Sequence, residues 1–176
     1  MVVVEKYYDP HGLLIENTGY TLREILEHPE YVRFRWFKPS ELEIMKRWIY
    51  EYRFSGTYFF GYQLPRMLNP EIIGKVVDTL PEIITLTRFK VDCVLKRNGE
   101  VWICEVKDYL LTTSLSQPVI YSELYRKYVN PQAITKPILI YGESAPEIEE
   151  IANKLNIQCF NLHHPTTRKH LAELIK

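Results

Sequence analysis

The sequence predicts a single α/β domain with a mixed central sheet flanked by helices. The chain has 176 residues, of which 46% are hydrophobic, and this is the size of one globular domain with a substantial core. Strand and helix patterns alternate in the C-terminal third, which is typical of parallel crossovers on a sheet covered on both faces. An Asn-Gly pair between two β-rich runs adds an antiparallel hairpin.

Charge and cysteine content exclude several classes of protein. The 22 Lys and Arg balance the 22 Asp and Glu, so the chain is no polybasic protein that coats nucleic acid by charge alone. The three cysteines form no C-x-x-C pair, so neither a disulfide scaffold nor a structural zinc is expected. No apolar run approaches the roughly eighteen residues that cross a bilayer. We therefore expect a cytoplasmic protein with no membrane partner.

An N-terminal α/β extension is expected over residues 1–39, packed on the core. Two β-rich runs, 2–8 and 13–16, flank a turn-rich Asp-Pro-His-Gly tetrapeptide and predict a hairpin. A capping-box pattern at Thr21 and Glu24 then predicts a short helix, which ends before a proline. The alternation over residues 31–37 predicts a further strand.

The main domain is expected over residues 40–176. Ser40 and Glu43 form the capping pattern of a helix that ends near Gly56. The elements expected after it are a strand at 57–63, a helix at 70–78, a loop at 108–116, a helix at 116–129, a strand at 137–141, a helix capped by Ser144 and Glu147, a strand at 157–162 and a helix from about Thr167.

The Asn98-Gly99 dipeptide fixes the register of the central hairpin. A two-residue type I′ turn pairs residues whose numbers add to the same sum, which places Asp92 opposite Glu105 with their Cβ atoms roughly 5 Å apart. Lys107 shares the face of Glu105, because side chains alternate along a strand. The opposite face is apolar and consists of Val91, Cys93, Leu95, Trp102, Cys104 and Val106.

Two opposed carboxylates on one strand pair predict a metal site. Like charges in this position are destabilising, and a bound Mg²⁺ or Mn²⁺ would reverse that effect by taking oxygens from Asp92 and Glu105. The backbone carbonyl of Val106 is a further candidate ligand. The alternative is a solvated pair bridged by Lys107 and Lys90. Cys93 and Cys104 also oppose one another, and we expect two buried thiols.

The pattern D-x12-E-x-K across a hairpin resembles the PD-(D/E)XK nuclease superfamily, in its RecB-like and Holliday-junction-resolvase-like branch. The resemblance covers residues 40–162, although Val91 stands where the name-giving proline would be. It implies a restriction-endonuclease-like αβββαβ core, and with the chain's composition it suggests an archaeal or archaeal-virus source. Gln117 and Tyr121, at i and i+4 on the next helix, resemble the Q-x-x-x-Y motif that places the DNA backbone; a capping role for Gln117 is the alternative.

The family also places an acid on the first core helix. Glu41, Glu43 and Glu51 are the candidates, and we choose Glu41 as a metal ligand because it shares a helix face with core residues. The pair His163-His164 follows a strand and is expected to face solvent. No iron–sulfur cluster is expected, since the cysteine set for it is absent.

These resemblances imply a metal-dependent deoxyribonuclease acting in DNA repair, recombination or replication. Asp92 and Glu105 would hold the metal, and Lys107 would orient the water or stabilise the developing charge. Gln117 and Tyr121 would position the scissile phosphate or the neighbouring base. The partner would be DNA, single-stranded or branched, and the protein a homodimer. Candidate contacts to the DNA backbone are Arg33, Arg35, Lys46, Arg47 and Arg126. The alternative is an inactive nuclease-fold module for nucleic-acid binding or assembly. A splicing-type endonuclease would need a Tyr/His/Lys triad that the spacing does not provide.

Overall fold

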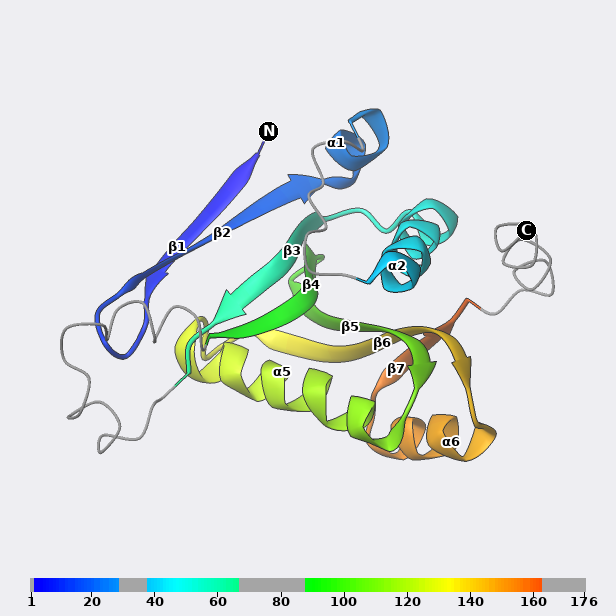
Figure 1. The fold of residues 1–176 in the computed structure, drawn as a ribbon. Helices are drawn as coiled ribbons and strands as arrows, with labels where there is room; N and C mark the ends of the chain where they lie inside the picture. Colours follow the sequence, from blue (N-terminus) through cyan, green and yellow to red (C-terminus); the bar gives the residue numbers. More distant parts are fainter. Residues whose placement is uncertain (1, 29–37, 67–87, 163–176) are drawn as a thin grey trace.

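The computed structural model describes residues 2–28, 38–66 and 88–162, and the fold class is α/β as predicted (Figure 1). One seven-stranded sheet has the order β1-β2-β3-β4-β5-β6-β7. Neighbours from β1 to β5 are antiparallel, whereas β5, β6 and β7 are parallel. The strands are β1 (Val3–Tyr8), β2 (Leu14–Thr21), β3 (Thr57–Leu64), β4 (Phe89–Arg97), β5 (Glu100–Leu110), β6 (Ile134–Ser144) and β7 (Gln158–Asn161).

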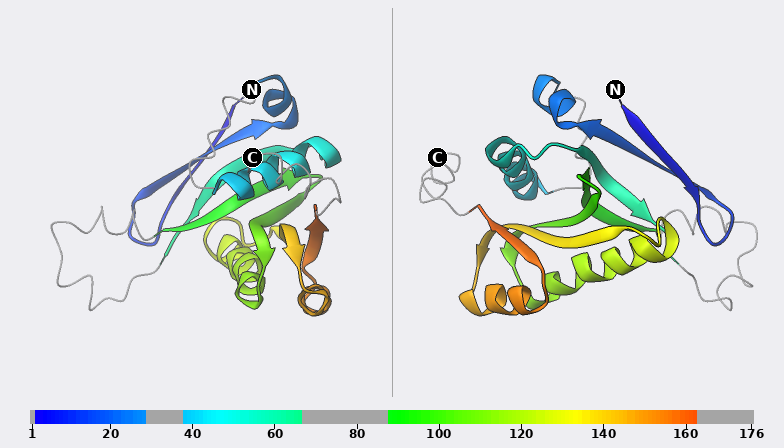
Figure 2. Two further views of the ribbon diagram at one scale, coloured as in Figure 1. Left: turned by 45° about the vertical axis from the view of Figure 1, so that its right-hand side comes forward. Right: turned by 180° about the vertical axis from the view of Figure 1, so that it is seen from behind.

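Helices cover both faces of the twisted sheet (Figures 1 and 2). Helix α2 (Pro39–Tyr52) packs on one face, where Trp48 lies in a fully buried cluster. Helices α5 (Ser116–Tyr128) and α6 (Pro146–Lys154) cover the other face. The described order from α2 to β6 is helix, three antiparallel strands, helix and strand, which agrees with the expected αβββαβ order. None of the helices in these ranges is both long and apolar enough to cross a membrane.

The N-terminal hairpin is an extension of the same sheet. Its turn is closed by Asp9, whose Oδ1 accepts hydrogen bonds from the backbone N–H groups of His11 and Leu13, both at 2.9 Å. The other carboxylate oxygen of Asp9 forms a buried ion pair with Arg88 at 3.0 Å. Helix α1 (Leu22–Glu27) follows with the predicted capping box between Thr21 and Glu24.

The central hairpin has the predicted register. Asn98 and Gly99 have φ values of 48° and 79°, as a type I′ turn requires. Pairing runs from Arg97↔Glu100 back to Cys93↔Cys104, and both thiols of the last pair are free and buried.

The sequence misplaced the starts of two helices, and proline explains both errors. Helix α2 begins at Pro39, so Lys38 is its N-cap and Glu41 Oε2 accepts a hydrogen bond from the Lys38 backbone N–H, in place of the predicted Ser40 and Glu43. Proline is favoured at the first helical position, because the N–H that it lacks has no partner there and its φ suits the helix. This preference determines which residue begins the first turn of α2.

Helix α6 shows the same effect. It begins at Pro146 with Ala145 as its N-cap, whereas Ser144 and Glu147 were predicted to cap it. Ser144 is instead the last residue of β6 and pairs with Leu110 of β5.

The predicted loop at 108–116 is largely ordered structure. Strand β5 continues to Leu110 because β6 pairs with it along its whole length, and a 3₁₀ helix, η2 (Thr112–Leu115), follows. Four further predictions fall outside the described residues: the strand at 31–37, the helix at 70–78, the pair His163-His164 and the helix from Thr167.

Candidate functional site

Strands β4 and β5 separate beside the two predicted acids. Their ladder ends at Cys93↔Cys104, so the predicted pair Asp92↔Glu105 is not part of it, while β5 goes on in parallel pairing with β6. Beyond that point Asp92 Oδ2 accepts a hydrogen bond from the backbone N–H of Val106 at 2.8 Å. A carboxylate thus takes the place of a backbone acceptor, and we call this gap the β4–β5 opening.

Glu105 lies in this opening and is only 3% exposed. Its Oε1 accepts a hydrogen bond from Lys107 Nζ at 2.7 Å. Its Oε2 is buried and accepts no hydrogen bond from a donor among the described residues, although Glu105 and Asp92 are close enough to share a proton. Lys107 Nζ is also 3.9 Å from Asp92 Oδ2. The structure therefore brings together Asp92, Glu105 and Lys107, and leaves one buried carboxylate oxygen unsatisfied.

The pKa values of these groups reflect burial and close charges. Burial and the nearby Asp92 carboxylate raise the pKa of Glu105 to about 8. Burial also raises the pKa of Asp92, against the effect of the hydrogen bond from Val106. Burial lowers the pKa of Lys107, but the adjacent Glu105 and Asp92 carboxylates outweigh it, so that this pKa is raised overall. Two acids that resist ionisation together are typical of a site that needs a further cation.

The backbone of Val106 is oriented toward the same opening. Its N–H points to Asp92. The N–H and C=O of one residue in an extended strand point toward the same neighbour, so the Val106 carbonyl also faces β4. Carboxylate and carbonyl oxygens are the ligands that Mg²⁺ and Mn²⁺ prefer. The donors in the opening fit a divalent cation, and the unsatisfied Glu105 Oε2 is the observation that supports the fit.

Glu41 approaches the opening from α2 without joining the two acids. It is buried, and its Oε2 accepts a hydrogen bond from the Lys38 backbone N–H at 3.2 Å. Its charge acts on both Asp92 and Lys107. Across the described ranges, no group of three or more His, Cys, Asp or Glu side chains lies close enough together to hold a metal ion. Any protein site here therefore rests on Asp92, Glu105 and backbone oxygen, with Glu41 nearby.

The predicted pair on α5 lies beside the acids. The Gln117 side chain and the charges of Glu105, Asp92 and Lys107 all act on the Tyr121 hydroxyl. The hydroxyl's pKa is raised, chiefly by burial and then by the two carboxylates, although Gln117 and Lys107 oppose this. The helix following the hairpin thus places its polar pair at the opening.

A break in strand alternation accompanies this opening. Gly61 of β3 has a φ of 61° and faces Asp92, since the flanking pairs are Phe60↔Cys93 and Tyr62↔Val91. Val91 packs in the cluster under α5, on the face opposite to that predicted from alternation with Cys93. The break in alternation changes the face to which side chains point on both strands, as irregularities beside functional sites often do.

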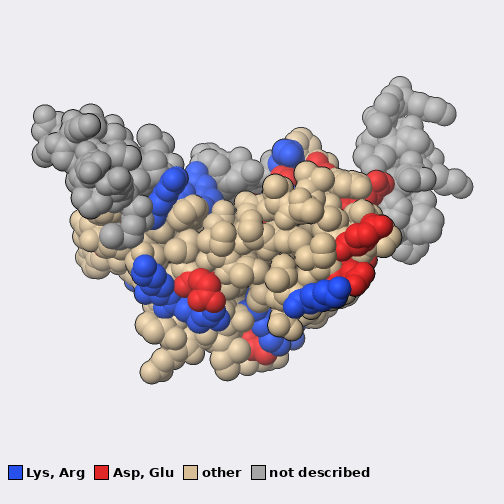
Figure 3. All heavy atoms as spheres, turned by 90° about the horizontal axis from the view of Figure 1, so that it is seen from below, with Lys and Arg blue, Asp and Glu red and all other residues tan. Residues whose placement is uncertain are grey.

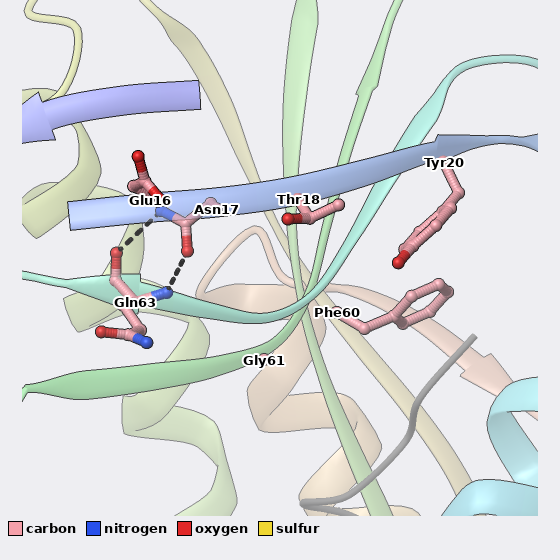
Figure 4. Close-up of a pocket in the computed structure, with 7 residues that line it drawn as sticks. All are labelled: Glu16, Asn17, Thr18, Tyr20, Phe60, Gly61 and Gln63. Carbon is pink, nitrogen blue, oxygen red and sulfur yellow. Dashed lines mark hydrogen bonds between the residues drawn. The ribbon is translucent and has the colours of Figure 1, made fainter. Parts of the chain in front are cut away.

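A second opening, between β2 and β3, was missed by the sequence analysis (Figure 4). The ladder of these strands covers only Gly19↔Phe59 to Thr21↔Thr57. Farther along, Asn17 bridges the strands: its Oδ1 accepts from the Gln63 backbone N–H at 2.8 Å, and its Nδ2 donates to the Gln63 carbonyl at 3.3 Å. The one signal in the sequence is Gly61, because a glycine inside a strand often marks a bulge or a close approach.

Charges of both signs are mixed on the face over α5 and α6 (Figure 3). Acidic side chains gather at the end where α6 lies. Of the cations proposed to contact DNA, Arg47 pairs with Glu51 at 3.0 Å, and Arg126 pairs with Glu123 and donates to Thr135 Oγ1. Arg33 and Arg35 lie outside the described residues. The local pairing agrees with the net charge of zero.

Comparisons with known proteins assign no family. No family model matches the chain, and no curated protein matches it. Among solved structures, the chain is similar to AF1548, described as a protein of unknown function, with 12% identity and a TM-score of 0.43. The match covers 72% of this chain and 59% of AF1548.

Proposed function

We propose that this protein is a metal-dependent nuclease that hydrolyses DNA phosphodiester bonds at the β4–β5 opening. The observation that carries the proposal is the buried Glu105 carboxylate, which lies beside Asp92 and Lys107 and whose Oε2 accepts no hydrogen bond from a donor in the part of the chain that the structure describes. Asp92, Glu105 and the Val106 carbonyl would hold Mg²⁺ or Mn²⁺. A divalent cation bound there would supply charge neutralisation at the phosphate and a lower pKa for water.

The residues around the opening have distinct tasks in hydrolysis. The water oxygen forms a bond to phosphorus while the bond to one bridging oxygen breaks, which leaves a phosphate monoester and a hydroxyl. Lys107 Nζ, held by Glu105 at 2.7 Å, can donate to a phosphate oxygen and stabilise the charge that develops there. Gln117 and Tyr121 would orient the phosphate from α5, because their linked polar groups face the same opening.

The decisive test compares Glu105→Gln with the parent on linear duplex, single-stranded, flapped and four-way-junction DNA in Mg²⁺ or Mn²⁺. Loss of one metal-holding carboxylate should lower cleavage of the preferred substrate on the order of 10³-fold, because metal stabilisation of the transition state amounts to several kcal/mol. The matched control is Glu150→Gln, whose side chain is 66% exposed and pairs with Lys154 on α6. This control should cleave like the parent.

Two outcomes would contradict the proposal. Equal cleavage by the parent and Glu105→Gln would remove the assignment of the site. No cleavage of any substrate by the parent, together with no Mn²⁺ binding in a calorimetric titration, would favour the non-catalytic nuclease-fold module. The homodimer and the cytoplasmic location expected from the sequence stay predictions, and sedimentation of the protein alone and on a four-way junction would measure the oligomeric state.

A further inference from the structure

The β2–β3 opening contains a pocket on the face of the sheet that carries α2. The open hollow has a volume of about 190 Å³. Tyr20 and Phe60, which line it, also pack on the core cluster beneath α2. Figure 4 shows the two rings at one end of the pocket and the Asn17–Gln63 bridge at the other. The lining residues are Glu16, Asn17, Thr18, Tyr20, Phe60, Gly61 and Gln63.

The chemistry of this lining suits a flat, polar ring better than a phosphate. Its groups are two aromatic rings, two amides, two hydroxyls and one carboxylate, and none is cationic. Aromatic rings stack on any nucleobase, and hydroxyls pair with base edges. The Thr18 and Tyr20 hydroxyls are the candidates for that role, because the other polar side chains are bonded within the protein: Asn17 to the Gln63 backbone, Gln63 Oε1 to Arg88 and Glu16 to Lys6. A drug-sized ligand needs about 300–1,000 Å³, so the smaller volume fits a single ring system.

The pocket lies two strands from the candidate metal site. Gly61 lines the pocket and faces Asp92 on the next strand, about 4.8 Å away by strand spacing. Along the sheet, two strand spacings, roughly 10 Å, separate the two openings, and the Glu105 side chain points to the other face of the sheet, because it alternates with Cys104 and Val106. Lys6, which is 2.5 Å from Glu16 and whose side chain is 59% exposed, places a cation at the rim where a sugar–phosphate backbone would leave the pocket.

The geometry points to a binding site for one unstacked nucleobase of the strand that is cleaved. This inference rests on the proposed nuclease function and deepens it, because it names the substrate class: DNA with an unpaired nucleotide on the cleaved strand. A base inside an intact duplex is stacked and paired, so it cannot enter a pocket of this kind without being extruded.

The test is a binding scan that does not depend on cleavage. Single-stranded oligonucleotides with one abasic site, moved stepwise along the strand, are titrated into Glu105→Gln protein by fluorescence anisotropy. One abasic position should weaken binding at least about fivefold, the lower limit for the loss of one stacked base. Tyr20→Ala should remove that positional penalty, whereas Tyr20→Phe should retain it.

Two further variants distinguish loss of the pocket from misfolding of the protein. Thr18→Trp fills the pocket from an exposed strand position, so it should also remove the penalty without disturbing the core. Tyr8→Ala changes a tyrosine that is 70% exposed and outside the pocket, and should leave the penalty unchanged. Melting temperatures of all variants confirm folding.

The possible failures are distinguishable. A flat abasic scan, no binding of single strands, or a penalty that survives both Tyr20→Ala and Thr18→Trp would overturn the base-binding pocket. If the parent cleaves DNA while the scan is flat, the nuclease proposal stands alone. If the positional penalty appears but no substrate is cleaved, the pocket stands and the nuclease proposal fails.

Discussion

The two openings of the sheet use the same backbone device with different chemistry. In each, two antiparallel strands separate and a side chain replaces the missing ladder bond: Asn17 bridges to Gln63, and Asp92 bridges to Val106. The neutral amide of Asn17 both accepts and donates: it accepts from the Gln63 backbone N–H and donates to the Gln63 carbonyl, which also accepts a hydrogen bond from the Tyr7 hydroxyl. The Asp92 carboxylate accepts only, and it stands beside a second buried acid.

The two openings therefore differ in hydrogen bonding: the polar groups of the Asn17 bridge have partners within the protein, whereas the carboxylates beside the Asp92 bridge do not all have a donor in the described ranges. A buried polar group normally has a partner, and Asn17 meets that rule within the chain. Glu105 Oε2 does not meet it among the described residues. The β2–β3 opening is therefore structurally self-sufficient and holds a neutral pocket, whereas the β4–β5 opening has the charge and the free oxygen that a cation would use.

The largest expected effect is that of Asp92→Asn. The new amide oxygen can still accept the Val106 N–H, so the free energy of unfolding without metal should not fall. Cleavage in Mg²⁺ should drop on the order of 10³-fold, because a metal ligand and its charge are lost. Calorimetric titration with Mn²⁺ should show binding by the parent only. Unchanged Mn²⁺ affinity in the variant would show that Asp92 is not a metal ligand and that the Asp92 and Asn17 bridges do not differ in this respect.

Asn17→Asp is the reverse exchange, and its main effect should be on stability. The carboxylate can accept from the Gln63 N–H, but it cannot donate to the Gln63 carbonyl, and it places a charge at a residue that is 5% exposed. The free energy of unfolding should fall by about 3 kcal/mol in urea denaturation.

The control for that exchange is Thr18→Asp, which adds the same charge at the exposed neighbouring position of β2. It should change stability by less than about 0.5 kcal/mol. Equal losses in the two variants would show that charge on β2, rather than the bridge, determines the effect.

Sequence alone predicted that the two acids and Lys107 lie together at the β4–β5 opening, though not that the strands separate there, because the signals for this cluster are local. Asn98-Gly99 fixed a register that brought Asp92, Glu105 and Lys107 together from positions within sixteen residues of one another. The β2–β3 opening depends on Asn17 and Gln63, which are 46 positions apart. No turn or periodicity links such residues, so only the folded sheet shows that they meet.

Local patterns also competed with one another in the sequence. Ser40 and Glu43 form a plausible capping box, but once Pro39 is placed at the first helical position it is Glu41 that accepts from the N-cap N–H, that of Lys38. The error matters for the site, because the capping role belongs to Glu41, the acid that was predicted to bind metal. The backbone preference of Pro39 was the stronger signal, and it determined where α2 begins.

Glu105→Gln should have a smaller effect without metal: above pH 8 it should raise the free energy of unfolding relative to the parent, on the order of 2 kcal/mol. Because the pKa of Glu105 is raised to about 8, the folded parent binds its proton more tightly than the unfolded chain does. Its contribution to stability is thus greatest below pH 4.5 and declines as pH rises through about 8. Denaturation from pH 4 to 9 should show this decline in the parent, and a flatter curve in Glu105→Gln. Parallel curves would mean that Glu105 is not a buried, strained acid.

The smallest change in stability, about 1 kcal/mol, is expected for Gly61→Ala, and it tests whether the openings depend on each other. An alanine at a φ of 61° is strained, and Gly12→Ala, at a φ of 78° in the first hairpin turn, provides a control with similar strain. Both variants should lose similar stability. Only Gly61→Ala should also lower cleavage, by about tenfold, because Gly61 faces Asp92 and lines the neutral pocket. Equal cleavage by the two variants would mean that the reversal at Gly61 shapes the sheet without positioning the acids, and the two openings would then be independent features of the fold.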